Sequence, residues 1–184
     1  MTTTKHASST IKLALMAAMA VAGVGVVNVS QAAQATAQAT GTVVAPIAIA
    51  VATNLAFGSF APGAGGSVTV STSGVRTASG PVLLTATPSS AARFNITGQA
   101  GATYSIVHTG TVVLTNTTGA GGETMALTKF SDLTGANATS GTATSGSLSG
   151  LGTQSLFVGG TLAVGPTQVA GLYTGTVVAT VEYN

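Results

Sequence analysis

The sequence contains no cysteine and no tryptophan, and only 4% of its 184 residues are charged. The absence of cysteine excludes thiol catalysis, cysteine-bound metals and any disulfide framework. Two of the five basic residues, Lys5 and Lys12, lie in a segment that we expect to be removed, so the remaining chain is close to neutral. A surface for nucleic acid or for an anionic membrane needs clustered basic side chains, and this sequence has no such cluster.

Groups that carry out catalysis or bind metal ions are also scarce. After residue 35 the chain has one histidine, His108, and three carboxylates, Glu123, Asp132 and Glu182. No two of these four residues lie within eight positions of each other, which argues against a metal site. His108 and Asp132 would permit a Ser-His-Asp set, but no Gly-x-Ser-x-Gly turn marks a nucleophile. We therefore expect no catalytic residue, no metal and no cofactor, and a structural or surface role for His108.

The first 35 residues predict a cleaved signal peptide. A weakly basic start is followed by an apolar run, Leu13–Val29, and then by the small-x-small sequence Ala33-Gln34-Ala35. We expect cleavage after Ala35, with Ala37 and Ala39 as nearby alternatives. A membrane-anchoring helix is the other interpretation, but the apolar run falls short of the ~20 residues that a membrane span needs. Export through the inner membrane is therefore expected, with no membrane span in the mature chain.

The rest of the chain is rich in glycine, threonine, alanine, serine and valine. β-branched residues favour strands, whereas glycine, serine and asparagine favour turns. Apolar and polar residues alternate in several short segments, and no stretch has the 3.6-residue period of an amphipathic helix. This pattern is typical of an all-β sandwich or barrel. We assign residues 53–184 to one β-sandwich domain.

Two segments in the middle of the chain carry more specific expectations. Tyr104–His108 and Val112–Asn116 predict a β-hairpin across Thr109–Gly110. Residues 134–150 are small and polar apart from Leu148, and they predict a long exposed loop or a weak hairpin.

The two ends of the predicted domain show the clearest alternation. From Tyr173 to Tyr183 the odd positions are mostly apolar and the even positions mostly polar, which predicts one long strand with one face on the core. Residues 41–52 alternate as well. Because Pro46 cannot donate to a strand ladder, we expect this segment to lie at a sheet edge.

The C-terminal residues resemble a known signature. Gly171 stands fourteenth from the end, counting Asn184 as the first, and Tyr183 is penultimate. Subunits of chaperone–usher pili typically carry a glycine and a tyrosine at these two places. Further stretches make residues 41–184 similar to the DUF4402 family of bacterial exported proteins: Leu55-Ala56-Phe57-Gly58, Ala92-Arg93-Phe94-Asn95-Ile96-Thr97-Gly98 and Phe157-Val158-Gly159-Gly160-Thr161-Leu162.

The resemblance to pilus subunits implies an immunoglobulin-like sandwich that lacks its last strand. In such subunits a periplasmic chaperone first fills the groove, and the N-terminal extension of the next subunit replaces it by adding a strand. The resulting head-to-tail contact does not close, so a fibre grows. The resemblance therefore implies a structural subunit of a fimbria-like homopolymer, located in the periplasm and then at the cell surface. Its further partners would be a chaperone and an outer-membrane usher.

On this interpretation residues 36–52 are a donor-strand extension, and the alternative, which we favour less, is that they form the domain's own first strand. The expected donor positions are Gly41, Val43, Ala45, Ile47, Ile49 and Val51. The expected positions along the groove and chaperone-facing strand are Gly171, Tyr173, Gly175, Val177, Val181 and Tyr183. The alternative function is a self-complete secreted sandwich, acting as an adhesive or carbohydrate-binding module or as a coat protein. The lack of tryptophan disfavours the binding module, because sugars are usually stacked on exposed aromatic rings.

Overall fold

The computed structural model describes residues 32–118 and 121–184. The predicted signal peptide, residues 1–35, lies almost entirely outside the described residues. Residues 42–184 form one compact unit, and residues 32–41 belong to a separate N-terminal unit. In that N-terminal unit the described residues are exposed and form no strand.

The described part of the compact unit is built from strands alone, without a helix. The strands are β1 (Ala48–Thr53), β2 (Phe60–Ala61), β3 (Gly66–Val70), β4 (Arg76–Ser79), β5 (Val82–Leu83), β6 (Ala92–Thr97), β7 (Thr103–Gly110), β8 (Val113–Asn116), β9 (Thr124–Asp132), β10 (Ser145–Ser147), β11 (Thr153–Val164), β12 (Tyr173–Thr174) and β13 (Val177–Tyr183).

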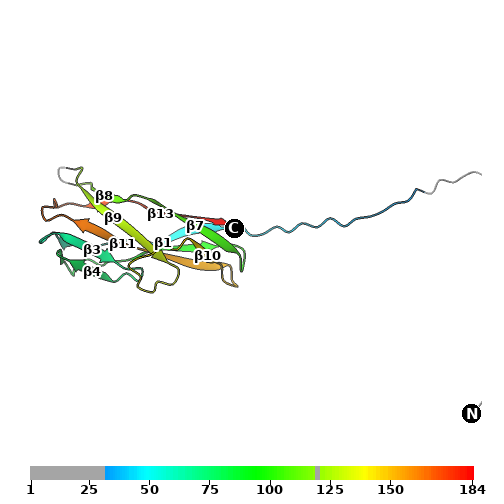
Figure 1. The fold of residues 1–184 in the computed structure, drawn as a ribbon, viewed down its shortest axis with the longest axis horizontal. Coiled ribbons are helices and arrows are strands. Elements are labelled where there is room, and N and C mark those ends of the chain that lie inside the picture. Colours follow the sequence, from blue (N-terminus) through cyan, green and yellow to red (C-terminus); the bar gives the residue numbers. More distant parts are fainter. Residues whose placement is uncertain (1–31, 119–120) are drawn as a thin grey trace, which may run out of the picture. The chain divides into compact units, whose positions relative to one another are not determined.

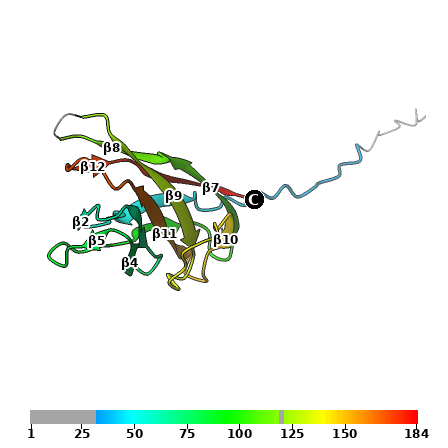
Figure 2. The same ribbon diagram turned by 60° about the vertical axis from the view of Figure 1, so that its left-hand side comes forward.

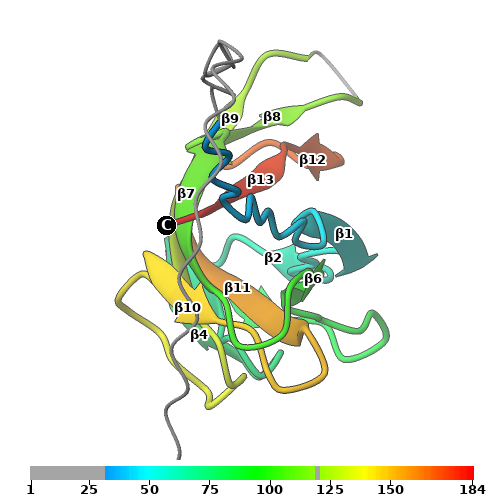
Figure 3. The ribbon, with the colours of Figure 1, turned by 90° about the vertical axis from the view of Figure 1, so that its right-hand side faces the viewer.

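These strands form two facing antiparallel sheets and one short ribbon (Figure 1). The larger sheet has the order β1-β6-β11-β9-β8-β12. The first half of β11 pairs with β6 and its second half pairs with β3, which carries β4 on its outer side. The smaller sheet has the order β10-β7-β13, and β2 pairs with β5. Figure 3 shows β7, β10 and β13 on one side of the sandwich, with β6 and β11 on the other.

Alternating side chains form the core between the sheets. In β6, Ala92, Phe94 and Ile96 are buried while the residues between them are exposed. They pack with Tyr104 and Ile106 of β7, and with further buried residues of β11 and β13, in one cluster. A second cluster lies under β3, β9 and β11 and includes Phe57. The predicted all-β sandwich is thereby confirmed.

The predicted hairpin between Tyr104–His108 and Val112–Asn116 is wrong. Strand β7 pairs with β10 and β13, whereas β8 pairs with β9 and β12. The chain changes sheets at Gly110, whose φ of 89° is readily adopted only by glycine. Alternation identified both strands, but it carries no information about which neighbour each strand selects.

The single strand predicted from Tyr173 to Tyr183 is divided into two. Strand β12 pairs with β8 and β13 pairs with β7, so the chain crosses from the larger to the smaller sheet at Gly175–Thr176. Thr111 fixes this crossing, because its N–H and hydroxyl donate to the Thr176 carbonyl at 3.0 and 3.1 Å. The inward face of β13 is as predicted, with Ala179 and Val181 buried.

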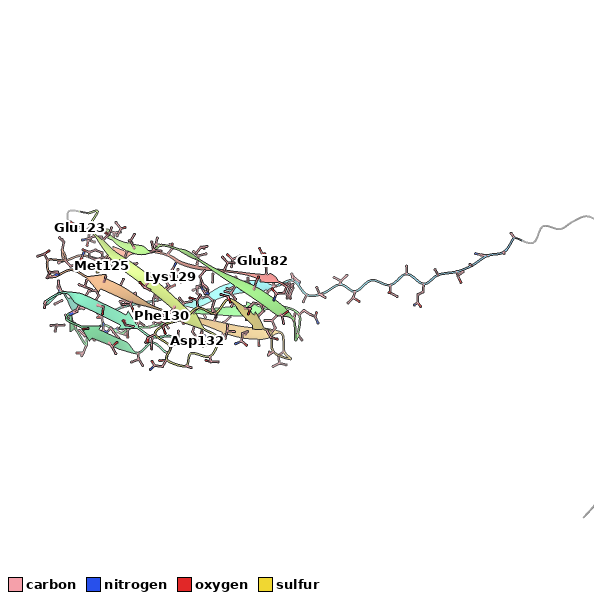
Figure 4. All side chains as sticks on the ribbon, in the orientation of Figure 1. Glu123, Met125, Lys129, Phe130, Asp132 and Glu182 are labelled. Carbon is pink, nitrogen blue, oxygen red and sulfur yellow. The ribbon has the colours of Figure 1, made fainter. Side chains whose placement is uncertain are left out.

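Residues 133–144 form a loop that leads to the short strand β10, and Leu148 just after it is buried. The loop is anchored by Asp132 at the end of β9 (Figure 4). The Asp132 carboxylate accepts the Thr72 hydroxyl and three backbone N–H groups from residues 134–136. A segment with few apolar side chains is thus held in place by hydrogen bonds to one carboxylate.

Candidate strand-acceptor groove

Two strands that approach each other from opposite sheets each have an unpaired edge. Within residues 32–118 and 121–184, β1 pairs only with β6, and β13 pairs only with β7. The two strands come close without forming a ladder between the described residues (Figure 3). Along this gap the edge N–H and C=O groups are available to a further strand.

An apolar cavity of about 800 Å³ lies at one end of the gap. It is bounded by the segment that follows β1, residues 55–62, and by the segment that leads into β13, residues 168–175 together with Val177. The apolar side chains that line it include Leu55, Phe57, Leu127, Leu162 and Tyr173, all of which belong to the second core cluster or pack against it. Figure 2 shows β12, β2 and β5 gathered at this end of the sandwich. We call the gap and its cavity the groove.

Val51 shows that the groove is an uncovered part of the core. Directly opposed residues of an antiparallel pair point to the same face. The partner of Val51 is Phe94, which is 5% exposed, yet Val51 itself is 61% exposed. A valine on the core-facing side of β1 thus lacks a covering strand.

The positions expected to form the donor strand occupy two environments. Residues 41–46 are exposed and belong to no strand, and Val43 is 98% exposed. Ile47 is half-buried against the core immediately before β1. Ile49 and Val51 lie within β1, opposite Ile96 and Phe94 of the same domain. Residues 48–53 therefore form the domain's own first strand, at a sheet edge as Pro46 predicts, and the preceding residues are left without a partner strand.

The residues expected along the terminal strand lie beside the groove. Gly171, Tyr173, Gly175 and Val177 line the cavity, and Val181 is buried in the core under β13. Gly171 packs against the buried side chain of Asn116, which a Cβ at position 171 would overlap. Glycine is therefore required here by close approach.

The alternating pattern before β1 begins at residue 36, five residues before the predicted donor positions. In residues 36–45, which we call the arm, the odd positions are alanine, glycine or valine, and the even positions are threonine or glutamine except for Val44. Every residue of the arm is exposed and in no strand. The amino-acid composition of the arm indicates a strand only weakly, because alanine and glycine have low strand propensity. The spacing of the apolar residues at positions 37–43 is nevertheless that of a strand with one apolar face.

The hydroxyl of Tyr183 connects the end of the arm to the sandwich. It accepts the Gln99 N–H at 2.6 Å and donates to the Ala45 carbonyl at 2.8 Å. The Ala45 N–H donates in turn to Oε1 of Gln99 at 3.4 Å. A Cβ at Gly98 would overlap the tyrosine hydroxyl. We call this set of hydrogen bonds the latch.

His108 and Asp132 do not form a catalytic set. Nε2 of His108 lies 2.9 Å from the Ala143 carbonyl and 3.1 Å from Oγ of Ser131. Because a carbonyl oxygen only accepts hydrogen bonds, Nε2 must carry the proton and so cannot act as a base toward Ser131. The Asp132 carboxylate accepts its hydrogen bonds from Thr72 and the following loop.

Two further observations concern metals and membranes. In residues 32–118 and 121–184, no three potential ligand side chains of histidine, cysteine, aspartate or glutamate lie close enough together to hold a metal ion. In the same part of the chain, no helix has the length and apolar character needed to cross a membrane.

The fold and the groove together define an all-β sandwich domain in which, among the described residues, β1 and β13 each keep an unpaired edge. A family model described as "Domain of unknown function (DUF4402)" matches residues 47–183, and the chain therefore belongs to this family. The match begins at the residue before β1, so it includes the groove and leaves out the arm. No curated protein and no solved structure matches the chain.

Proposed function

We propose that this protein is the structural subunit of a surface polymer, in which each copy inserts its arm as a strand into the groove of the next copy. The observation that carries the proposal is the pair of unpaired edges on β1 and β13, together with the apolar cavity lined by the adjoining residues 55–62 and 168–175. A strand placed there would pair with an open edge and cover apolar side chains such as Val51 and Val177.

The arm has the features required of the inserted strand. Its odd positions would present Ala37, Ala39, Gly41 and Val43 to one face, and its even positions from 36 to 42 would present hydroxyl and amide groups to the other. This is the pattern of a strand with one face on a core and the other in solvent. A second copy is the favoured occupant because the same chain carries both an unpaired strand and an open acceptor.

The expected binding free energy depends on the backbone as much as on side chains. Burying a methyl-sized group contributes about 0.8 kcal/mol and burying a valine about 1.5–3 kcal/mol, so the arm's apolar face contributes only ~4 kcal/mol. Each ladder hydrogen bond adds about 0.5–1.5 kcal/mol. Small side chains also let the inserted backbone approach the groove closely. A long-lived contact therefore needs the full ladder along β13.

Export and assembly factors follow from the same proposal. A protein that polymerises at the surface must cross the inner membrane first, in agreement with the leader predicted at residues 1–35. Its open groove would need protection before assembly, because an exposed apolar edge aggregates. We therefore propose a periplasmic chaperone that covers the groove before assembly, and an outer-membrane usher at which the copies are joined.

The test compares arm variants of the mature chain, residues 36–184, on a denaturing gel without heating. We expect the unchanged chain to give a ladder of heat-sensitive multimers. Val43→Asp should abolish the ladder, because it places a charge on the apolar face of the arm. Thr42→Asp is the matched control on the opposite face and should retain it.

A second measurement uses a synthetic peptide of residues 36–45 added to the Val43→Asp chain. Filling the groove should raise the thermal midpoint by about 5–10 °C, and a peptide with the same Val43→Asp change should have no effect. A single monomer band for the unchanged chain, with a midpoint that neither the arm nor the peptide alters, would leave a self-complete secreted domain in place of the proposed subunit.

A further inference from the structure

We infer that the latch and Pro46 bar the arm from its own groove, so that docking occurs only between copies. This inference rests on the proposed function and specifies its partner: the occupant of each groove is the arm of another chain. The length of the arm does not by itself prevent the arm from entering the groove of its own molecule, which we call self-insertion. The ten-residue arm spans about 33 Å as a strand, and the six residues of β1 span only about 20 Å.

The direction of the chain defines what self-insertion would require. Strand β1 begins near Tyr183, at the end of β13, and runs toward the cavity, where β13 begins. An arm that entered its own groove would have to reverse immediately before β1 and run back beside it. The reversal would be a tight turn at residues 44–46, in the place where the arm joins the domain.

The two shortest turns are both incompatible with this sequence. A two-residue turn at Ala45–Pro46 would place Thr42 opposite Ile49, so the polar face of the arm would enter the core. It would also put Pro46 at the second central position, which disfavours the turn unless the peptide bond is cis. A three-residue turn restores the correct face, but it usually requires the left-handed conformation at its last residue, here Pro46, whose ring fixes φ near −65°.

The latch opposes the looser turns. The Ala45 carbonyl is bound by the Tyr183 hydroxyl at 2.8 Å, and the Ala45 N–H is directed to Gln99. Ala45 also precedes a proline, which favours an extended backbone at this residue. Since Ile47 is already packed against the core, the chain is held on both sides of Pro46. A longer loop would have to break these hydrogen bonds and withdraw Val43, the largest apolar side chain on the inward face of the arm.

The test refolds the mature chain at nanomolar concentration, where chains meet slowly, and measures the thermal midpoint of the monomer. The unchanged chain and Val43→Asp should melt at the same temperature, because the arm contributes nothing within its own molecule. Adding the peptide of residues 36–45 should raise both midpoints.

The double variant Pro46→Gly/Tyr183→Phe removes both obstacles. We expect it to refold as a monomer that melts about 5 °C or more above the unchanged monomer, and to lose the multimer ladder. Adding Val43→Asp to the double variant should remove this gain, which shows that the arm is its source. Tyr104→Phe, which removes a hydroxyl directly across the strand pair from Tyr183, should leave the ladder intact.

Two outcomes overturn the inference, and they are distinguishable from each other. In the first outcome, the unchanged monomer has a higher thermal midpoint than the Val43→Asp monomer, or the double variant forms the same multimer ladder as the unchanged chain. The latch then does not keep the arm out of its own groove, and only the proposed function remains. If the peptide raises no midpoint and no chain forms a ladder, the groove does not accept the arm and both proposals fail.

Discussion

Tyr104 and Tyr183 lie directly opposite each other on β7 and β13, and their hydroxyl groups are in contrasting environments. The hydroxyl of Tyr183 makes two short hydrogen bonds in the latch. The hydroxyl of Tyr104 is buried beside Gly146 and has no partner among the described residues. Burial raises the pKa of Tyr104 above its ordinary value. Replacement by phenylalanine should therefore remove an unsatisfied hydroxyl at Tyr104 but break two hydrogen bonds at Tyr183.

Tyr104→Phe should leave stability unchanged or raise it by up to about 1 kcal/mol, because it removes a buried hydroxyl that has lost its water without gaining a partner. Tyr183→Phe should reduce the protection of the Ala45 region against proteolysis. Urea unfolding of monomeric chains measures the first effect, and limited proteolysis measures the second. A loss of more than about 1 kcal/mol in Tyr104→Phe would show that its hydroxyl is satisfied after all.

Asp132 gives the sandwich a defined sensitivity to acid. Burial acts to raise its pKa, but the hydrogen bonds from Thr72 and from the backbone of residues 134–136 together outweigh burial, so the pKa lies below its ordinary value. A carboxyl whose folded pKa is depressed stabilises the fold above the unfolded pKa, about 3.9. That contribution is lost as the pH falls through the folded pKa.

Asp132→Asn should therefore cost about 1–3 kcal/mol at neutral pH, because the amide nitrogen cannot accept the hydrogen bonds made by the lost carboxylate oxygen. The difference between the unchanged chain and the variant should shrink as the pH falls below about 4. Thermal midpoints from pH 7 to pH 2 measure both. A difference that stays constant over this range would assign the effect to packing of the loop instead.

At the scale of single strands, β1 has one side in the groove and the other in solvent. Val51→Asp should abolish multimers and leave the monomer folded, since this side chain is 61% exposed in the single chain. Ala50→Asp, one position away on the outer face of β1, should polymerise normally. Circular dichroism of both monomers controls for folding, and the unheated gel provides the readout. Normal polymerisation of Val51→Asp would place the inserted strand away from β1.

Much of this strand-level picture could be predicted from alternation, and its failures have a common cause. The inward positions on β13 followed from period two, and the edge position of β1 followed from Pro46. Alternation did not reveal that Ile49 pairs with Ile96 of its own domain, because a first strand and a donated strand have the same pattern. It also missed the change of sheets at Gly110 and the break at Gly175–Thr176. Both depend on contacts with residues distant in sequence, such as Thr111 with Thr176.

At the scale of the whole molecule, the proposed function gives each chain one arm and one groove, and therefore a head-to-tail contact between copies. A mixture of Val43→Asp, which keeps a working groove, with Val51→Asp, which keeps a working arm, should give a complex of one copy of each and nothing longer. Native mass spectrometry measures the stoichiometry. Longer species from the mixture, or from either variant alone, would contradict a single contact between each pair of copies.

The hydrogen bond between Tyr183 and Ala45 joins residues 138 positions apart. Contacts this distant in sequence form late, because the intervening chain must fold first. The arm therefore acquires its fixed exit only when β13 has docked beside β7. On the proposed function, folding of the sandwich therefore comes before assembly: a chain in which β13 has not yet docked lacks both the hydrogen bond at Ala45 and the unpaired edge of β13 that would accept a strand.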